Sequence, residues 1–306
     1  MWGGGLYLHP PVLQESQRHA RIIFLLLSGV NPYILKVLEL LLLLGTAFAV
    51  RMLMNRLFSS LFRTGIYILL ACLSATSLSL TRTPMLAPEI GMLLIIYGSY
   101  LLAVAGSNNN LSSRVLRASF SISVASLLFF PYTPLLLLAP LATIQQRAMD
   151  LRIFCAWLVG TALPHAFSLA ACYLFGLPLL AYLPDYSIAG LSPEVLLNSM
   201  LANPLRLAYW LTLIALWIVA ELLYPPQLSS QRNSFLLARN LRIFTIVSLL
   251  LGLVLANAAP GITLALGLTI TIPIARMLLS TQRVKLKTLL FITLLAMATI
   301  TQLVGY

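Results

Sequence analysis

Long apolar stretches separated by single basic residues are the feature that most limits how this chain of 306 residues can fold. Hydrophobic residues make up 60% of the sequence and charged residues only 8%, with a mean hydropathy of +0.97. A soluble domain carries about 25% charged residues to cover its surface. The pattern therefore excludes a soluble enzyme, a disordered tail and a disulfide scaffold, and it predicts an all-α, polytopic integral membrane protein.

About ten membrane helices are predicted, because a spanning helix needs about 20 apolar residues. The predicted segments are Pro32–Val50, Thr64–Leu80, Glu89–Ala105, Ala118–Phe130, Tyr132–Ile144, Leu151–Gly176, Arg206–Leu223, Ile243–Ala256, Gly261–Leu279 and Lys287–Val304. The fourth and fifth are short and lie next to Pro131 and Pro134, which prevent a continuous helix, so we expect a short Pro-broken hairpin. No repeat or linker divides the sequence, and we expect residues 1–306 to form a single transmembrane domain.

The basic residues predict an orientation, because cytoplasmic loops of membrane proteins carry an excess of Lys and Arg. If the first segment runs inward, fourteen basic residues lie at inner loops and segment ends, and four lie outside. The inner set is Arg51, Arg56, Arg63, Arg114, Arg117, Arg147, Arg152, Arg232, Arg239, Arg242, Arg276, Arg283, Lys285 and Lys287. The outer set is Arg18, Arg21, Arg82 and Arg206. We therefore expect a multi-pass protein of the bacterial inner (cytoplasmic) membrane.

Two outer segments are predicted to hold amphipathic helices at the membrane interface. Residues 1–31 form an outer-face tail ending in one such helix, and residues 177–205 form the largest outer loop. In that loop Ser192, Pro193 and Glu194 make a good helix start. The orientation leaves two alternatives for the N-terminus: the short tail is translocated, or the natural chain begins upstream with one more span.

Several loosely patterned segments are shared with a known group of proteins. They are Leu25–Tyr33, Arg51–Leu57, Ala125–Pro131, Asp150–Arg152 and Leu163–His165. With these segments the chain resembles an uncharacterised Bacteroidota family of polytopic inner-membrane proteins, a domain of unknown function. The resemblance covers most of the chain from about residue 22 and implies an additional N-terminal span, but no activity. The short paired helices and outer amphipathic helices also resemble polyprenyl-phosphate-dependent membrane glycosyltransferases.

Ionisable residues inside predicted segments are the first candidates for an intramembrane polar site, because each costs about 2.5–3.5 kcal/mol at a helix centre. Lys36 and Glu39 share a helix face, where they form either a functional ion pair or an interfacial anchor. His165 follows Pro164 in a long apolar run and either binds a polar ligand or satisfies a freed backbone carbonyl. Glu221 is either an active carboxylate or pairs with an inner-face arginine such as Arg232 or Arg239 in a salt bridge at the rim of the membrane.

A transferase that uses a polyprenyl-phosphate donor would need an outward acid as a general base and a cation for the phosphate. Asp185 with Arg206 or Arg82 has the right chemistry and supplies weak catalytic candidates. The similar transferases place their acid in the first outer loop, where this chain offers only Glu15. No catalytic residue is therefore assigned, and the sequence favours a non-catalytic protein without deciding whether the chain is an enzyme.

Other ligand classes find little support in the sequence. The basic residues do not cluster on a soluble segment, so no nucleic acid is expected as a partner. The three cysteines lie in apolar runs and the three histidines lack metal spacing, so neither a metal site nor a cofactor is expected. The small-residue run Ala118–Ser126 is predicted to let helices approach closely, with its serines bonding across the contact or back to their own helix.

Three functions remain open. The first is a non-catalytic subunit that assembles with other envelope membrane proteins or lipids. The second is a transferase or carrier acting on a polyprenyl-linked sugar at the outer face. The third is a small-solute or lipid transporter with a site at the broken hairpin and His165.

Overall fold

The computed structural model describes residues 31–57, 86–105, 110–174, 204–223, 232–254, 259–280 and 284–304. Every regular element in these ranges is a helix, which confirms the predicted all-α class. The elements are α3 (Pro32–Leu57), α5 (Leu86–Ala105), α6 (Leu111–Leu128), the 3₁₀ helix η3 (Phe130–Leu137), α7 (Leu138–Gln145), α8 (Leu151–Leu174), α11 (Pro204–Leu223), α12 (Arg232–Val254), α13 (Ala259–Ser280) and α14 (Val284–Val304).

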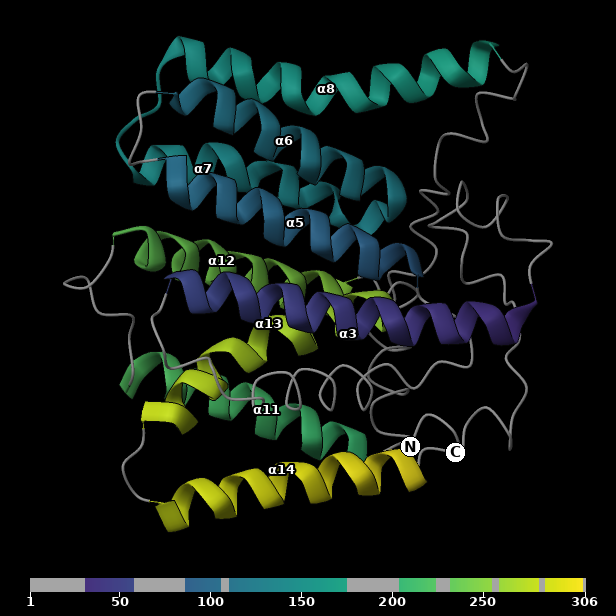
Figure 1. Ribbon diagram of the computed structural model, residues 1–306, viewed down its shortest axis with the longest axis vertical. Helices are drawn as coiled ribbons and strands as arrows, with labels where there is room; N and C mark the ends of the chain where they lie inside the picture. The colour runs from purple at the N-terminus through teal and green to yellow at the C-terminus, as the bar shows by residue number, and fades with distance from the viewer. Residues whose placement is uncertain are drawn as a thin grey trace.

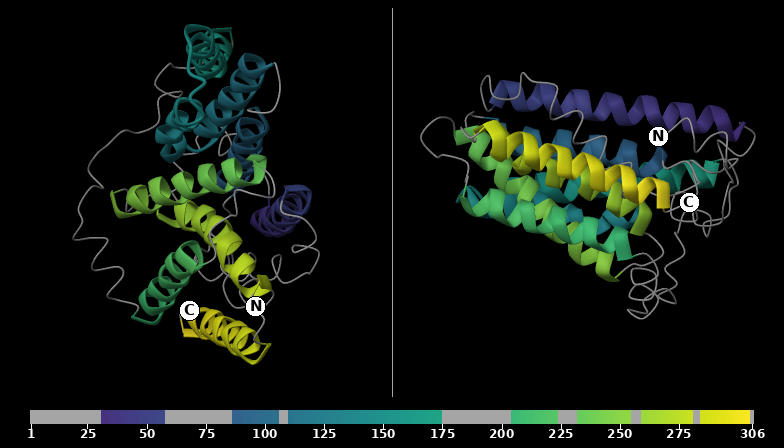
Figure 2. Two further views of the ribbon diagram at one scale, coloured as in Figure 1. Left: turned by 90° about the vertical axis from the view of Figure 1, so that its left-hand side faces the viewer. Right: turned by 90° about the horizontal axis from the view of Figure 1, so that it is seen from below.

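The helices lie side by side in a stack, with α8 at one edge and α14 at the other (Figure 1). Helix α6 packs between α8 and α5, and α5 in turn contacts α3, α12 and α13. Helix α11 contacts both α13 and α14. The end-on view in Figure 2 shows α3 beside this stack. The predicted segment Thr64–Leu80, the tail 1–31 apart from its last residue and most of the loop 177–205 lie outside the described residues.

Two predicted segments begin earlier in the structure than the apolar runs suggested. Helix α6 starts at Leu111 rather than Ala118, and α12 starts at Arg232 rather than Ile243. In both cases the first turns of the helix are polar and carry arginines, so a search for apolar runs misses them. The consequence is that Arg239 and Arg242 belong to a helix and not to a loop.

The predicted break between α6 and α7 is present and has a local cause. Phe129 is extended, Pro131 occupies the start of η3, and Pro134 lies inside it. Proline cannot donate the backbone hydrogen bond that a continuous α-helix needs. The Tyr132 hydroxyl donates a 3.1 Å hydrogen bond to the Pro88 carbonyl and so ties the turn to the start of α5.

The small residues of α6 act as predicted, in helix packing. The Ser121 hydroxyl donates to the Leu94 carbonyl of α5 at 2.9 Å, and the Ser123 hydroxyl donates to the Thr161 carbonyl of α8 at 2.7 Å. Ser126 bonds back to Ser123 within its own helix at 2.8 Å. A Cβ atom at Gly160 of α8 would lie only 2.6 Å from the Leu116 carbonyl oxygen, so the two backbones are in close contact.

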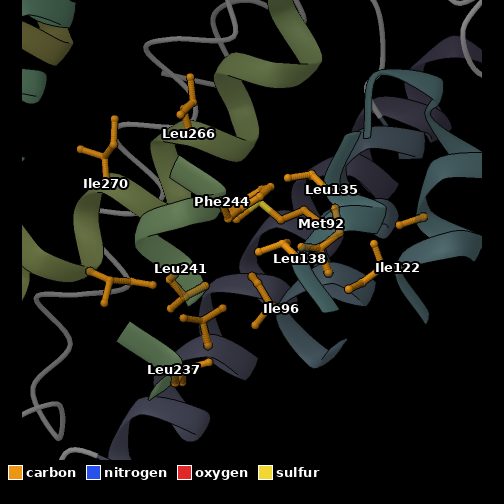
Figure 3. Close-up of a cluster of buried hydrophobic side chains, with 14 of the residues drawn as sticks. Met92, Ile96, Ile122, Leu135, Leu138, Leu237, Leu241, Phe244, Leu266 and Ile270 are labelled. Carbon is orange, nitrogen blue, oxygen red and sulfur yellow. The ribbon is translucent and has the colours of Figure 1, made fainter. Parts of the chain in front are cut away.

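The apolar core lies between α5 and the broken hairpin on one side and α12 and α13 on the other. Figure 3 shows Met92, Leu135 and Leu138 meeting Phe244 of α12 in this core. Because α12 and α13 pack directly on this core, the core holds in place the helices that carry the charged cluster described next.

Candidate functional site

Helix α3 has polar residues on its buried side and apolar residues on its exposed side. Glu39 and Thr46 are buried together with Leu43, whereas Leu41 is 62% exposed and Phe48 51% exposed. In a helix on the surface of a soluble protein the exposed side is instead polar or charged. The exposed side of α3 is therefore suited to an apolar surrounding.

Exposed apolar faces recur on the other helices at the edge of the stack, although the residues that these helices bury are apolar as well. Large apolar side chains are exposed on α8, α11 and α14: Leu151, Phe154, Leu158, Val159, Phe167, Leu169, Tyr173, Leu174, Leu211, Ile218, Val219, Leu222, Leu223, Leu289, Ile292, Leu295 and Ile300. The buried polar residues include Ser99, Asn240, Thr245 and Thr271. Contiguous exposed apolar surface marks a membrane or protein interaction surface.

Two helices in the described part of the chain are long and apolar enough to cross a membrane. They are Leu86–Val104 of α5 and Leu151–Leu174 of α8, of which the second is only 17% buried inside the fold. Shorter apolar helices cover Leu207–Leu223, Thr269–Leu278 and Thr288–Met297. These lengths and compositions give weak support to a membrane protein.

The helices start and finish at two common ends. The last residues of α3, α5, α7, α11 and α13 and the first residues of α6, α8, α12 and α14 lie on the left in Figure 1. We call this side the basic end, because the basic residues Arg114, Arg117, Arg147, Arg152, Arg232 and Lys285 lie on it. The opposite end contains Lys36 and Arg206 at the starts of α3 and α11.

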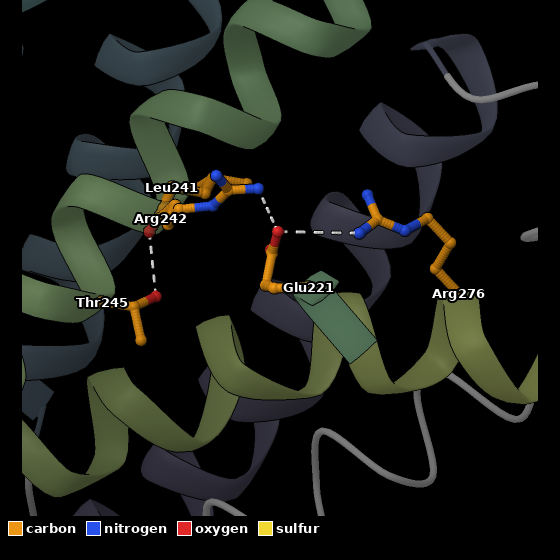
Figure 4. Close-up of polar contacts among 5 residues, drawn as sticks. All are labelled: Glu221, Leu241, Arg242, Thr245 and Arg276. Carbon is orange, nitrogen blue, oxygen red and sulfur yellow. Dashed lines mark hydrogen bonds and ion pairs between the residues drawn. The ribbon is translucent and has the colours of Figure 1, made fainter. Parts of the chain in front are cut away.

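A charged cluster joins three helices toward the basic end. Glu221 near the end of α11 lies between Arg242 of α12 and Arg276 of α13 (Figure 4). One Arg242 nitrogen donates a hydrogen bond to Glu221 Oε2, and Arg276 Nη2 lies 3.9 Å from the same oxygen. The cluster contains two positive charges and one negative charge, which leaves one positive charge in excess.

The cluster is largely shielded from solvent. The side chains of Glu221 and Arg276 are each 11% exposed, and that of Arg242 is 38% exposed. Arg242 Nε and Arg276 Nε and Nη2 are buried and have no hydrogen-bond acceptor within the part of the chain that the structure describes. Buried hydrogen-bond donors in proteins nearly always have an acceptor, so we expect these three nitrogens to bind one.

Glu221 pairs with arginines of the predicted inner set, as expected, but with different members from the two suggested. Its ion-pair partners in the structure are Arg242 and Arg276, whereas Arg239 lies over the Phe235 ring at 5.8 Å from its centroid. The side chain of Arg232, the other suggested partner, lies outside the described residues.

The residues of the predicted intramembrane polar site lie on two helices that are not neighbours, with Lys36 and Glu39 on α3 and His165 on α8. Glu39 of α3 is 1% exposed and His165 of α8 is half-buried, with α5 and α6 between their two helices. The side chain of Lys36 lies outside the described residues, as do Arg82, Asp185 and the side chain of Arg206. The structure therefore does not test whether the proposed transferase residues lie close together.

Two buried polar groups escaped the sequence analysis. Glu89 is fully buried in the first turn of α5, and Asn240 is fully buried on α12. The Asn240 side-chain nitrogen donates a 3.4 Å hydrogen bond to the Ser99 carbonyl of α5. Asn240 lies in the polar first half of α12, which the search for apolar runs did not recognise as helical.

Comparison with known proteins adds no relative: no family model, curated protein or solved structure matches this chain. Among the described residues no group of three or more His, Cys, Asp or Glu side chains could hold a metal ion. The Glu221–Arg242–Arg276 cluster is therefore taken as the candidate functional site, on the basis of its geometry alone.

Proposed function

We propose that the chain is a multi-spanning protein of a bacterial cytoplasmic membrane, with its basic end on the cytoplasmic side. The observation that carries this proposal is the exposure of large apolar side chains on the outward faces of the edge helices α3, α8, α11 and α14. A bilayer tolerates such a surface, whereas water would drive it to aggregate. The concentration of basic residues at one end supports the orientation.

Within the membrane, the chain acts as a non-catalytic subunit that assembles with other envelope proteins. Two charged groups outside the Glu221 cluster serve the architecture. The Arg114 guanidinium bonds the Val104 carbonyl at the end of α5, and Asp150 accepts a 2.7 Å hydrogen bond from the Ile153 amide at the start of α8. Helix α8, packed mainly on α6, leaves an apolar face for lipid or a partner helix.

Affinity purification from native membranes in mild detergent tests this role. We expect one other membrane protein to be recovered in a fixed stoichiometric ratio, as mass spectrometry of the eluate and the mass of the particle would show. The same tag on an unrelated polytopic protein of similar abundance provides the control. Recovery of the chain alone, as a monomer, in every detergent that preserves its fold would contradict the subunit role.

A further inference from the structure

We infer that the Glu221–Arg242–Arg276 cluster binds a phosphate group, and that the phosphate belongs to the headgroup of an anionic phospholipid. The first observation is the charge of the cluster, in which two guanidinium groups share one carboxylate. A buried charge without a partner is costly, and one excess cation between three helices therefore favours an anionic ligand.

The second observation is the set of donors. Arg242 Nε and Arg276 Nε and Nη2 are buried without an acceptor in the described ranges. An arginine side chain only donates hydrogen bonds, so a ligand that satisfies it must supply acceptor oxygens. Phosphate supplies several such oxygens around one centre and matches the guanidinium fork. Arg239, one helical turn before Arg242, adds positive charge to the same segment.

The third observation separates a lipid from a free phosphate ion. Arg242 is followed on one stripe of α12 by Ile246, 43% exposed, and Leu250, 58% exposed. Residues spaced by four lie above one another on a helix, so this apolar track extends about 12 Å along α12 from Arg242 to Leu250. A phospholipid has this layout, with a charged headgroup joined to an acyl chain, and basic sites between helices on the cytoplasmic side bind such headgroups.

The test is a titration of the full chain in neutral detergent, followed by native mass spectrometry. The probes are dioleoyl phosphatidylglycerol, dioleoyl phosphatidylcholine and inorganic phosphate. We expect phosphatidylglycerol to bind more tightly than phosphatidylcholine, and Arg242→Gln and Arg276→Gln each to weaken it about tenfold or more. Arg152→Gln removes the same charge from an exposed position on α8 and should leave the affinity unchanged.

Glu221→Gln is the decisive variant, because it frees both guanidinium groups for the ligand. We expect it to bind phosphatidylglycerol several-fold more tightly, a change that misfolding does not produce. The inference is overturned if native protein, Arg242→Gln and Arg276→Gln bind equally. It is also overturned if Arg152→Gln loses as much affinity as Arg276→Gln, or if Glu221→Gln with unchanged thermal stability binds no tighter.

Inorganic phosphate distinguishes the two sources of the ligand. Displacement of phosphatidylglycerol only at high phosphate concentration supports the lipid headgroup, and binding of phosphate alone with equal affinity overturns the lipid assignment in favour of a soluble oxyanion. The lipid assignment rests on the proposed membrane location, but the phosphate titration does not. The experiment can therefore distinguish a wrong phosphate site from a wrong membrane location.

Discussion

Close contact between α6 and α8 depends on the absence of one side chain. A Cβ atom at Gly160 would lie 2.6 Å from the Leu116 carbonyl oxygen and 2.9 Å from Ser119 Cβ. The nearest of these atoms is backbone, which cannot rotate away. The Ser123 hydroxyl bond to the Thr161 carbonyl lies next to this contact and depends on the same separation between the helices.

Gly160→Ala is expected to destabilise the fold by about 1–3 kcal/mol, because the added methyl group forces α8 away from α6. The measurement is the thermal or denaturant midpoint of the purified protein in detergent. Gly45→Ala on α3 is the matched control, since no atom lies within 4 Å of a Cβ there. The control should be neutral or stabilising by up to about 1 kcal/mol. Equal midpoints for the two variants would contradict the close contact.

At the scale of single elements, the informative property is the face that each helix presents. Helix α8 is mostly exposed, yet it is one of the most apolar helices described. Leu158, two turns into the helix, is 49% exposed, and Leu151 at its start is 78% exposed. In water, a charge at either position would be well solvated. In a bilayer, the cost of that charge depends on its depth.

Leu158→Asp and Leu151→Asp therefore form a matched pair. We expect Leu158→Asp to cost about 2.5–3.5 kcal/mol of insertion free energy and to reduce the yield of folded protein from membranes sharply. Leu151→Asp should have little effect, because an acid at a helix start is favourable and lies near the membrane surface. The readout is the amount of monodisperse protein extracted from membranes. Equal yields for the two variants would count against a bilayer around α8.

For the whole molecule, the two ends of the stack are expected to face opposite sides of the membrane. Arg152 and Tyr173 lie near opposite ends of α8, and both are exposed. They are separated by 21 residues, or about 32 Å of helix, which is close to the thickness of a bilayer core. One helix thus provides a reporter for each side.

In a background with Cys72, Cys155 and Cys172 replaced by alanine, we expect Tyr173→Cys to react with a membrane-impermeant maleimide in intact cells. Arg152→Cys should react only after the membrane is permeabilised, because the proposed orientation places the basic end in the cytoplasm. The reversed pattern would invert the proposed orientation. Labelling of both positions in intact cells would exclude a membrane-spanning α8.

Periodic apolar runs were enough to predict where most of the described helices lie. The Pro-broken hairpin and the packing role of the serines in α6 also followed from local chemistry, since proline and small side chains act over a few residues. Helix starts that carry arginines were missed, as at α12, because a helix extending past the apolar run has no hydropathy signal.

The sequence by itself determined the helical class and the separation of the basic residues from the apolar runs, because both depend on neighbours along the chain. Only the tertiary structure decided which charges meet. Glu221, Arg242 and Arg276 come from three helices, and no spacing in the sequence relates them. The burial of Glu39 and Glu89 was likewise settled by packing, since a helix face becomes an interior only when another helix lies against it.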